Sequence, residues 1–124
     1  MRIVLDWLAL VALCGFNFWL SAQETLSVPS VLLNQDKLEH AGFYFIMGVL
    51  AWRAFRHFAW SNTSLIIVSI IYCSLYGISD EWHQSLVPGR QSSIADWIAD
   101  TLGATLAMYA VQRFKAHAIK LSGH

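Results

Sequence analysis

Four long apolar runs, separated by short polar stretches, dominate the pattern of hydrophobic and polar positions along this chain of 124 residues. Each run comes close to the length of about 20 residues that an α-helix needs to cross a lipid bilayer. The runs are roughly Ile3 to Leu20, Leu38 to Phe58, Ser64 to Glu81 and Ile94 to Phe114. The pattern predicts an all-α polytopic membrane protein, with residues 1–124 forming a single domain built as a compact bundle of four transmembrane helices.

The composition agrees with a membrane location. Hydrophobic residues make up 56% of the chain and charged residues 13%, whereas soluble domains average about 25% charged residues. The formal net charge is zero and no basic patch is present, which excludes nucleic acid as a partner. Cys14 and Cys73 both lie inside apolar runs, so we expect buried thiols rather than a disulfide.

The first apolar run has a second interpretation. Arg2 followed by an apolar stretch is also typical of a secretory signal peptide. However, Asp6 interrupts the apolar region, and the best cleavage point, after Ala22, has Leu20 where a small residue is needed. We therefore expect the first run to stay in the protein as a helix.

The distribution of Lys and Arg predicts the orientation. With four spans, both termini and the middle loop share one side of the membrane. That side would carry Arg2, Arg53, Arg56, Arg113, Lys115 and Lys120, and the other side Lys37 and Arg90. Because positive residues favour the cytoplasm, we expect a protein of the inner membrane with both termini in the cytoplasm. His57, His117 and His124 are expected on the cytoplasmic surface, and the tail after Val111 as a basic interfacial segment.

Two helix starts carry capping signals. Asp36 with Glu39 three residues later fits a capping box at the second run, and Ser93 with Asp96 fits one at the fourth. Capping alone could explain Asp36, Glu39 and Asp96. It does not explain His40 and Tyr44.

Polar residues at four-residue spacing continue into the second and third runs, and such residues lie above one another on one face of a helix. The first stripe is Asp36, His40 and Tyr44, and the second is Tyr76, Asp80 and Gln84. Glu81 pairs with Gln84 at three-residue spacing. Pro88-Gly89 then turns the chain and presents Arg90.

The fourth run combines a small-residue face with an acid. Small residues at four-residue spacing let another helix approach closely, and here they are Ala95, Ala99, Gly103 and Ala107. Asp100 lies about two turns into the run, where an ionised Asp costs up to about 2.5–3.5 kcal/mol. We expect Asp100 to be protonated, or to face a polar interior within reach of Arg90, Lys37 or a hydroxyl group.

These polar residues would gather at the outer membrane face. The candidate ligand-binding set is Asp36, Lys37, His40, Tyr44, Asp80, Glu81, Gln84, Arg90, Asp96 and Asp100. One alternative is that they only join helices, at about 0.6 kcal/mol per hydrogen bond. Their number favours a functional pocket, in which Arg90 points inward at Glu81 or Asp96. We expect His40, Glu81 and Arg90 to lie within one ligand's width of each other and to line a cleft open to the outer leaflet.

An ordered set of motifs resembles the VanZ-like family. The matching residues, from about 34 to 111, are Asp36-Lys37-x-x-His40, Tyr44, Gly48, Tyr76-Gly77-x-x-Asp80-Glu81-x-x-Gln84, Pro88-Gly89-Arg90, Asp96 and Gly103. The resemblance implies a small multi-pass bacterial membrane protein of the cell envelope. The namesake is associated with resistance to teicoplanin, a lipoglycopeptide antibiotic. Many relatives carry Asn where this chain has Asp100.

Two hypotheses about function follow. In the first, the protein binds or modulates an anionic envelope lipid or a lipid-linked cell-wall precursor, with effects on glycopeptide susceptibility; Lys37, His40 and Arg90 supply positive charge. In the second, it is a membrane-embedded hydrolase or transferase acting on a lipid-linked envelope substrate. His40 or Glu81 would then be the catalytic acid–base residue and Arg90 would stabilise developing charge.

We expect no metal and no other cofactor. A zinc site built from His40, Glu81 and His83 has suitable ligand chemistry, but its spacing is not diagnostic. The expected partners are membrane lipids, and a lipid-linked cell-wall precursor or a lipoglycopeptide. The sequence leaves the ligand, the presence of catalysis and the oligomeric state open.

Overall fold

The computed structural model describes residues 2–22, 35–88 and 93–122. In chain order its elements are α1 (Arg2–Ser21), α2 (Gln35–Phe55), the 3-10 turn η1 (Arg56–Phe58), α3 (Asn62–Ser85) and α4 (Ile94–Ser122). The described ranges contain no strand, so the prediction of an all-α protein is confirmed.

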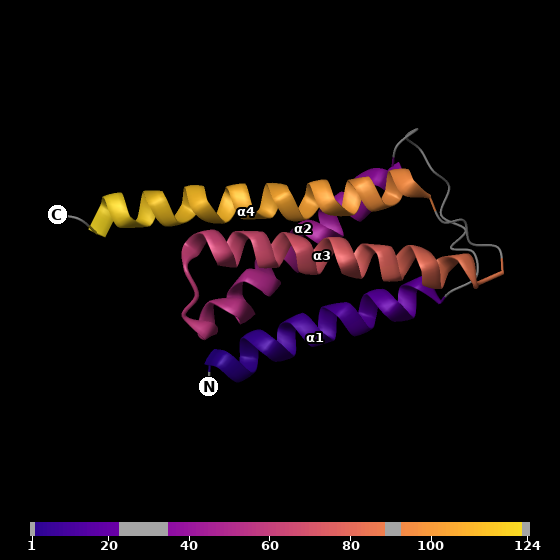
Figure 1. Cartoon of the computed structure of the whole chain (residues 1–124), viewed down its shortest axis with the longest axis horizontal. Helices are drawn as coiled ribbons and strands as arrows, with labels where there is room; N and C mark the ends of the chain where they lie inside the picture. Colours follow the sequence, from indigo (N-terminus) through magenta and orange to yellow (C-terminus); the bar gives the residue numbers. More distant parts are fainter. Residues whose placement is uncertain (1, 23–34, 89–92, 123–124) are drawn as a thin grey trace.

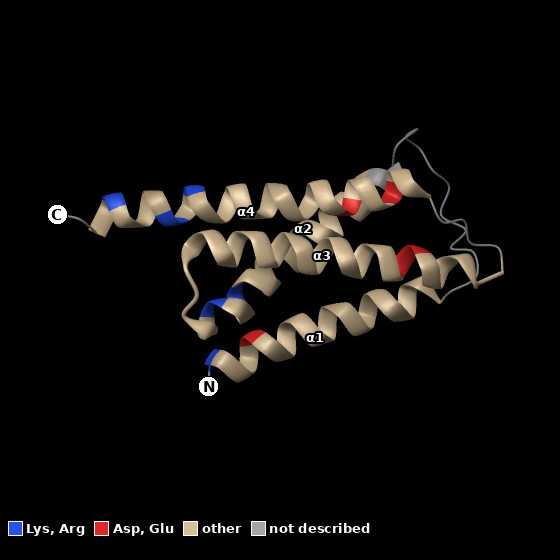
Figure 2. Ribbon diagram, viewed as in Figure 1, with Lys and Arg blue, Asp and Glu red and all other residues tan. Residues whose placement is uncertain are grey.

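The long helices lie side by side as a bundle (Figure 1). The beginning of α1, the connection between α2 and α3 and the end of α4 lie at one end of the bundle (Figure 1). Lys and Arg gather at this end, which we call the basic end, while Asp and Glu gather at the opposite, acidic end; Asp6 is the exception on α1 (Figure 2). Among the described residues, the start of α1, the end of α4 and the Lys and Arg side chains therefore share one end of the bundle, as the sequence predicts.

The closest helix contact joins α2 and α4 through small residues. A Cβ atom added to Gly103 would lie 2.1 Å from the carbonyl oxygen of Ala41, and one added to Gly48 would lie 2.9 Å from the Cβ of Ala107. The predicted small-residue face of α4 is thus confirmed, except at Ala95, which is exposed. Small side chains let the two backbones touch, and this contact fixes the relative height of the residues that α2 and α4 carry to the acidic end.

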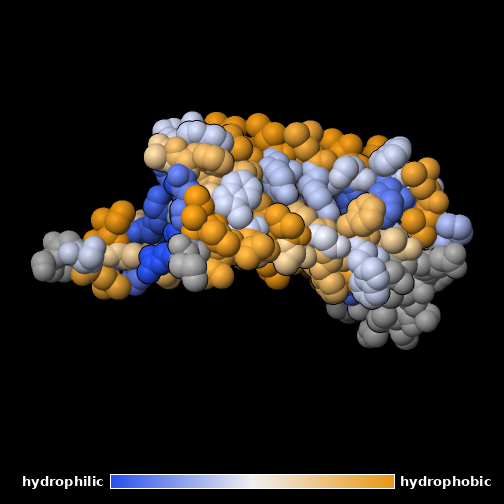
Figure 3. All heavy atoms as spheres, turned by 90° about the horizontal axis from the view of Figure 1, so that it is seen from below, coloured by the Kyte–Doolittle hydropathy of each residue, from blue (hydrophilic) through white to orange (hydrophobic). Residues whose placement is uncertain are grey.

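The exterior of the bundle is apolar. Among the described residues, two helices are long and apolar enough to cross a membrane, α1 and α3, and only 22% of each apolar window is buried inside the protein. A core helix of a soluble protein would be mostly buried, so these faces are suited to lipid. Hydrophobic and weakly polar residues dominate the middle of the face in Figure 3, and strongly hydrophilic ones lie toward the two ends.

Several helix boundaries differ from the prediction. α2 begins at Gln35, so Asp36 lies inside its first turn, and the predicted capping by its side chain lies outside what the structure describes. At the basic end, the Oγ of Ser61 caps α3 by accepting a hydrogen bond from the backbone N–H of Ser64. α4 continues to Ser122, so the tail predicted to be a basic interfacial segment is helical and forms the last part of α4.

Candidate functional site

Polar side chains from all four helices meet at the acidic end. His40 comes from α2, Asp80 and Glu81 come from α3, and Asp100 comes from α4. Ser21, at the end of α1, is buried among them. The short connections between helices bring groups together that lie up to 63 residues apart in the chain, as with Ser21 and Gln84.

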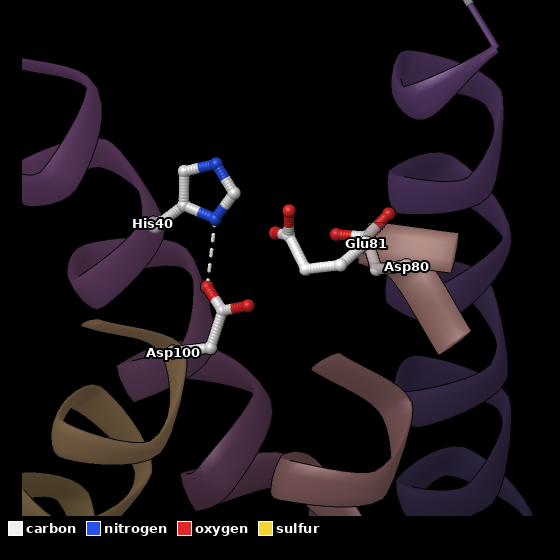
Figure 4. A group of neighbouring side chains, drawn as sticks. All are labelled: His40, Asp80, Glu81 and Asp100. Carbon is white, nitrogen blue, oxygen red and sulfur yellow. Dashed lines mark hydrogen bonds and ion pairs between the residues drawn. The ribbon is translucent and has the colours of Figure 1, made fainter. Parts of the chain in front are cut away.

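His40 is paired with a fully buried carboxylate. Its Nδ1 donates a hydrogen bond of 2.7 Å to Oδ1 of Asp100, and its Nε2 lies 3.9 Å from Oδ2 of Asp96 (Figure 4 shows the first of these contacts). Asp100 is 0% exposed. The sequence named Arg90, Lys37 or a hydroxyl as partners for Asp100, whereas in the described part of the protein Asp100 pairs with His40. Asp100 thus faces a polar interior, as expected, through a different partner.

Asp80 is held by hydroxyl groups from two other helices. Ser21 Oγ donates a hydrogen bond to one carboxylate oxygen of Asp80. Tyr44 Oη donates to the other oxygen at 3.3 Å. Gln84 Nε2 donates to Ser21 Oγ at 3.5 Å, which extends the network by one member. Asp80 and Gln84 of the second polar stripe are therefore buried against α1 and α2, while Tyr76 is half-buried.

Glu81 of α3 accepts a hydrogen bond from the start of α4. The backbone N–H of Ser93 donates to Oε2 of Glu81 at 2.9 Å, and the backbone N–H of Asp96 donates to Ser93 Oγ at 3.0 Å. The cap by Ser93 is confirmed. The reciprocal bond predicted from Asp96 is wrong, because Glu81 of α3 accepts that bond and ties the two helices together.

Four of these side chains converge closely enough to share one ligand. His40, Asp80, Glu81 and Asp100 each offer one donor atom, and these atoms all lie within 4.8 Å of one another. Figure 4 shows the carboxylates of Glu81 and Asp100 facing the ring of His40. His83, which the sequence placed in a zinc set with His40 and Glu81, is outside this group: its ring stacks on Phe18 at a centroid distance of 4.2 Å.

The polar residues border two hollows. One, of about 130 Å³, lies between α1, α2 and α3, and its polar lining includes His40, Asp80 and Gln84. The other, of about 340 Å³, lies between α3 and α4 and is lined by Glu81, Ser93 and Trp97 among others. His40 and Glu81 are close together, as expected, but they line separate hollows instead of one cleft.

Part of the predicted site lies outside the described residues. Arg90 falls there, and so do the side chains of Asp36 and Lys37, whose backbone belongs to the first turn of α2. The prediction that Arg90 points at Glu81 or Asp96 therefore stays a prediction.

Sequence reasoning missed a second buried ionic cluster, at the basic end. Asp6 is 4% exposed. Its carboxylate lies 3.1 Å from Arg53, 3.4 Å from Arg56 and 2.7 Å from His57. His57 was predicted to be a surface residue and is instead half-buried in this cluster. The sequence did contain a signal for this cluster. Asp6 is an acid inside an apolar run, and it lies on the side of the membrane where the predicted topology places Arg53 and Arg56.

A helical bundle with an apolar exterior, charges segregated toward its ends and buried polar groups near both of them has the features of a helical membrane protein. The family model described as VanZ/LLP1 matches residues 7–115, and the chain belongs to this family. The match confirms the resemblance and extends it into α1. Neither the curated proteins nor the solved structures include a match to this chain.

Proposed function

We propose that this chain is a multi-pass protein of the bacterial cytoplasmic membrane that binds the phosphate-bearing head group of an envelope lipid at its acidic end. The observation that carries the proposal is the convergence of His40, Asp80, Glu81 and Asp100 at one end of an apolar bundle. Intramembrane ionisable residues are costly, and such residues usually mark a ligand or ion site.

The segregation of charge supports four spans with the basic end in the cytoplasm. Lys and Arg at the basic end come from α1, α2 and α4, and the acidic end carries the carboxylates (Figure 2). Positive residues favour the cytoplasmic side, so the acidic end faces outward in this proposal. Among the described residues, α1 and α3 are apolar enough to cross a membrane by composition, whereas α2 and α4 are less apolar. Their close contact with each other through Gly103 and Ala41 supports their place in the same bundle.

The electrostatics limit how a phosphate can bind. Asp80, Glu81 and Asp100 repel an anion, and His40 is the cationic group that the described residues place among them. Direct recognition therefore needs Lys37 and Arg90, whose positions in the sequence flank the group. A ligand seated there would keep its acyl chains against the apolar exterior.

A hydrolase or transferase is the second candidate, and the pairing of His40 with Asp100 favours it. A buried carboxylate 2.7 Å from a ring nitrogen orients the imidazole and fixes which nitrogen is available for proton transfer. If the protein is such an enzyme, the purified wild type releases phosphate from a lipid-linked pyrophosphate, and the His40→Gln variant does not. Intact substrate after prolonged incubation with the wild type would exclude this second function.

Lipid analysis tests the binding proposal. The protein would be purified in a mild detergent and its bound lipids identified by mass spectrometry. We expect one phosphate-bearing envelope lipid to be enriched above its share of the membrane, and to be lost from the His40→Ala variant. Asn62→Ala is the matched control, because Asn62 is an exposed polar residue at the basic end. Bulk phospholipid in membrane proportions would contradict the proposal.

The link with glycopeptides is a separate proposal that rests on the family alone. If it holds, expression of the chain in a sensitive host raises the inhibitory concentration of teicoplanin, and the His40→Ala variant does not. Unchanged teicoplanin susceptibility on expression of the wild-type chain would contradict this proposal.

A further inference from the structure

The group at the acidic end has the dimensions of a metal coordination sphere. The donor atoms of His40, Asp80, Glu81 and Asp100 all lie within 4.8 Å of one another. A divalent ion held about 2.0–2.4 Å from its ligands keeps opposite ligands roughly 4.0–4.8 Å apart. One ion can therefore reach a donor atom of every member with small side-chain adjustments.

Two carboxylate oxygens in the group lack a partner within the described part of the protein. They are Oδ2 of Asp100 and Oε1 of Glu81, and both are buried. Asp100 as a whole is 0% exposed. Buried polar atoms are almost always satisfied by a donor, by water or by an ion. A cation between the two carboxylates would satisfy both oxygens at once.

Charge balance leads to the same conclusion. The group combines three carboxylates with one imidazole, and the next charged side chain that the structure describes near His40 is another acid, Asp96. Negative charge in excess is expensive beside an apolar exterior, and it is commonly relieved by a bound cation.

Hydrogen bonding between helices explains only part of the arrangement. Asp80 is satisfied by the hydroxyl groups of Ser21 and Tyr44, which leaves no need for an ion at that residue alone. However, carboxylates that bind metals are themselves usually held by such outer hydrogen bonds. The hydroxyl groups thus orient Asp80 without removing its ability to bind, and they do nothing for Glu81 Oε1 or Asp100 Oδ2.

We infer that His40, Asp80, Glu81 and Asp100 form a binding site for one divalent cation, of the Mn²⁺ or Zn²⁺ kind, which bridges the protein to the phosphate of the lipid. The imidazole nitrogen favours these ions over Ca²⁺ and Mg²⁺, which prefer oxygen ligands alone. The bridging role rests on the function proposed above, whereas the metal site itself does not.

Binding of Mn²⁺ alone tests the site. The protein in detergent is treated with EDTA, exchanged into metal-free buffer and titrated with Mn²⁺ under electron paramagnetic resonance. We expect one bound ion per chain that Zn²⁺ displaces. Pulsed spectra of the wild type should show coupling to a ¹⁴N nucleus, from His40. Absence of bound Mn²⁺, or bound Mn²⁺ without nitrogen coupling, overturns the inference, and this result requires no variant to fold.

Variants then assign the ligands. Glu81→Gln should weaken Mn²⁺ binding at least about tenfold, and His40→Gln should remove the nitrogen coupling. His83→Gln is the matched control, because His83 lies on the same helix as Glu81 but stacks on Phe18 outside the group. Equal affinity in Glu81→Gln and wild type, or loss of the nitrogen coupling in His83→Gln, places the ion elsewhere and overturns the inference.

A phosphate probe separates the metal site from the proposed function. Native mass spectrometry with added phosphatidic acid, and phosphatidylcholine as comparison, is run before and after EDTA. Selective loss of phosphatidic acid on EDTA treatment supports the bridge. Phosphatidic acid that stays bound after Mn²⁺ is removed overturns the bridge and leaves the proposed function standing. Bound Mn²⁺ with no preference for phosphatidic acid supports the site and overturns the proposed function.

Discussion

Asp80 illustrates how single residues organise the acidic end. Its two carboxylate oxygens accept hydrogen bonds from Ser21 of α1 and Tyr44 of α2, so one side chain of α3 joins three helices. A buried acceptor that loses its donor keeps the full cost of its lost hydration. The contribution of each hydroxyl should therefore be visible in the stability of the whole protein.

Replacing Ser21 with Ala should lower the stability of the protein by about 1–2 kcal/mol, because one oxygen of Asp80 loses its donor. Thermal unfolding of the purified variant in detergent measures the loss. Ser85→Ala is the control, since Ser85 is an exposed serine at the same end whose hydroxyl donates to the Trp82 carbonyl of its own helix. Equal melting temperatures for the two variants would show that the bond to Asp80 contributes nothing.

The Asp6 cluster predicts that loss of the acid destabilises the protein more than loss of one of its basic partners. Asp6→Asn should lower the melting temperature at least about twice as much as Arg53→Gln, because the first change leaves Arg53 and Arg56 without their shared carboxylate. Arg53 is half-exposed and regains water when its partner is lost, and such pairs contribute little. Melting curves of both variants in the same detergent provide the comparison, and a larger effect of Arg53→Gln would contradict it.

The contact between α2 and α4 is the most constrained pairing of helices. Gly103→Ala should reduce the yield of monodisperse protein, because the new Cβ would lie 2.1 Å from the Ala41 carbonyl oxygen and the backbones must separate. Gly42→Ala is the matched control: its Cβ would meet nothing within 4 Å, and Ala favours a helix by about 1 kcal/mol. Size-exclusion chromatography compares the two, and a normal yield of Gly103→Ala would refute the close contact.

The helices and their close contact could be predicted from the sequence because both depend on local patterns. Apolar runs set the helices, and Gly103 with its small neighbours at four-residue spacing marked the contact face. The pairing of His40 with Asp100 could not be predicted, since it depends on how far each helix is rotated about its axis. The charges in the sequence instead suggested Arg90 or Lys37 as the partner of Asp100.

The contribution of α1 to the site was also not predicted from the sequence. Ser21 stands at the end of an apolar run, where a lone serine has no distinctive pattern, and its role arises only when α1 packs beside Asp80. Asp6 was noticed as an interruption of the run, but its partners come from the end of α2. A single sequence can mark the residues that make such contacts, but it does not give their partners on helices far away in the chain.

The orientation of the whole protein can be tested by labelling. Cys14 and Cys73 are first replaced by Ala, and single cysteines are introduced at Ser27, Gln91 or Asn62. A membrane-impermeant maleimide added to intact cells should label the first two positions and should reach Asn62 only after permeabilisation, because Asn62 begins α3 at the basic end. The reverse pattern would show that the acidic end faces the cytoplasm, and it would exclude an envelope-facing site.

The segregation of charge between the two ends gives the protein an electric dipole along its long axis (Figure 2). In the proposed orientation the positive end of this dipole lies on the negative side of an energised membrane. Each elementary charge carried across a potential of 100 mV represents about 2.3 kcal/mol. The membrane potential therefore stabilises the same orientation that the positive residues favour during insertion. A cell that loses its potential would lose this part of the stabilisation even though no contact within the protein changes.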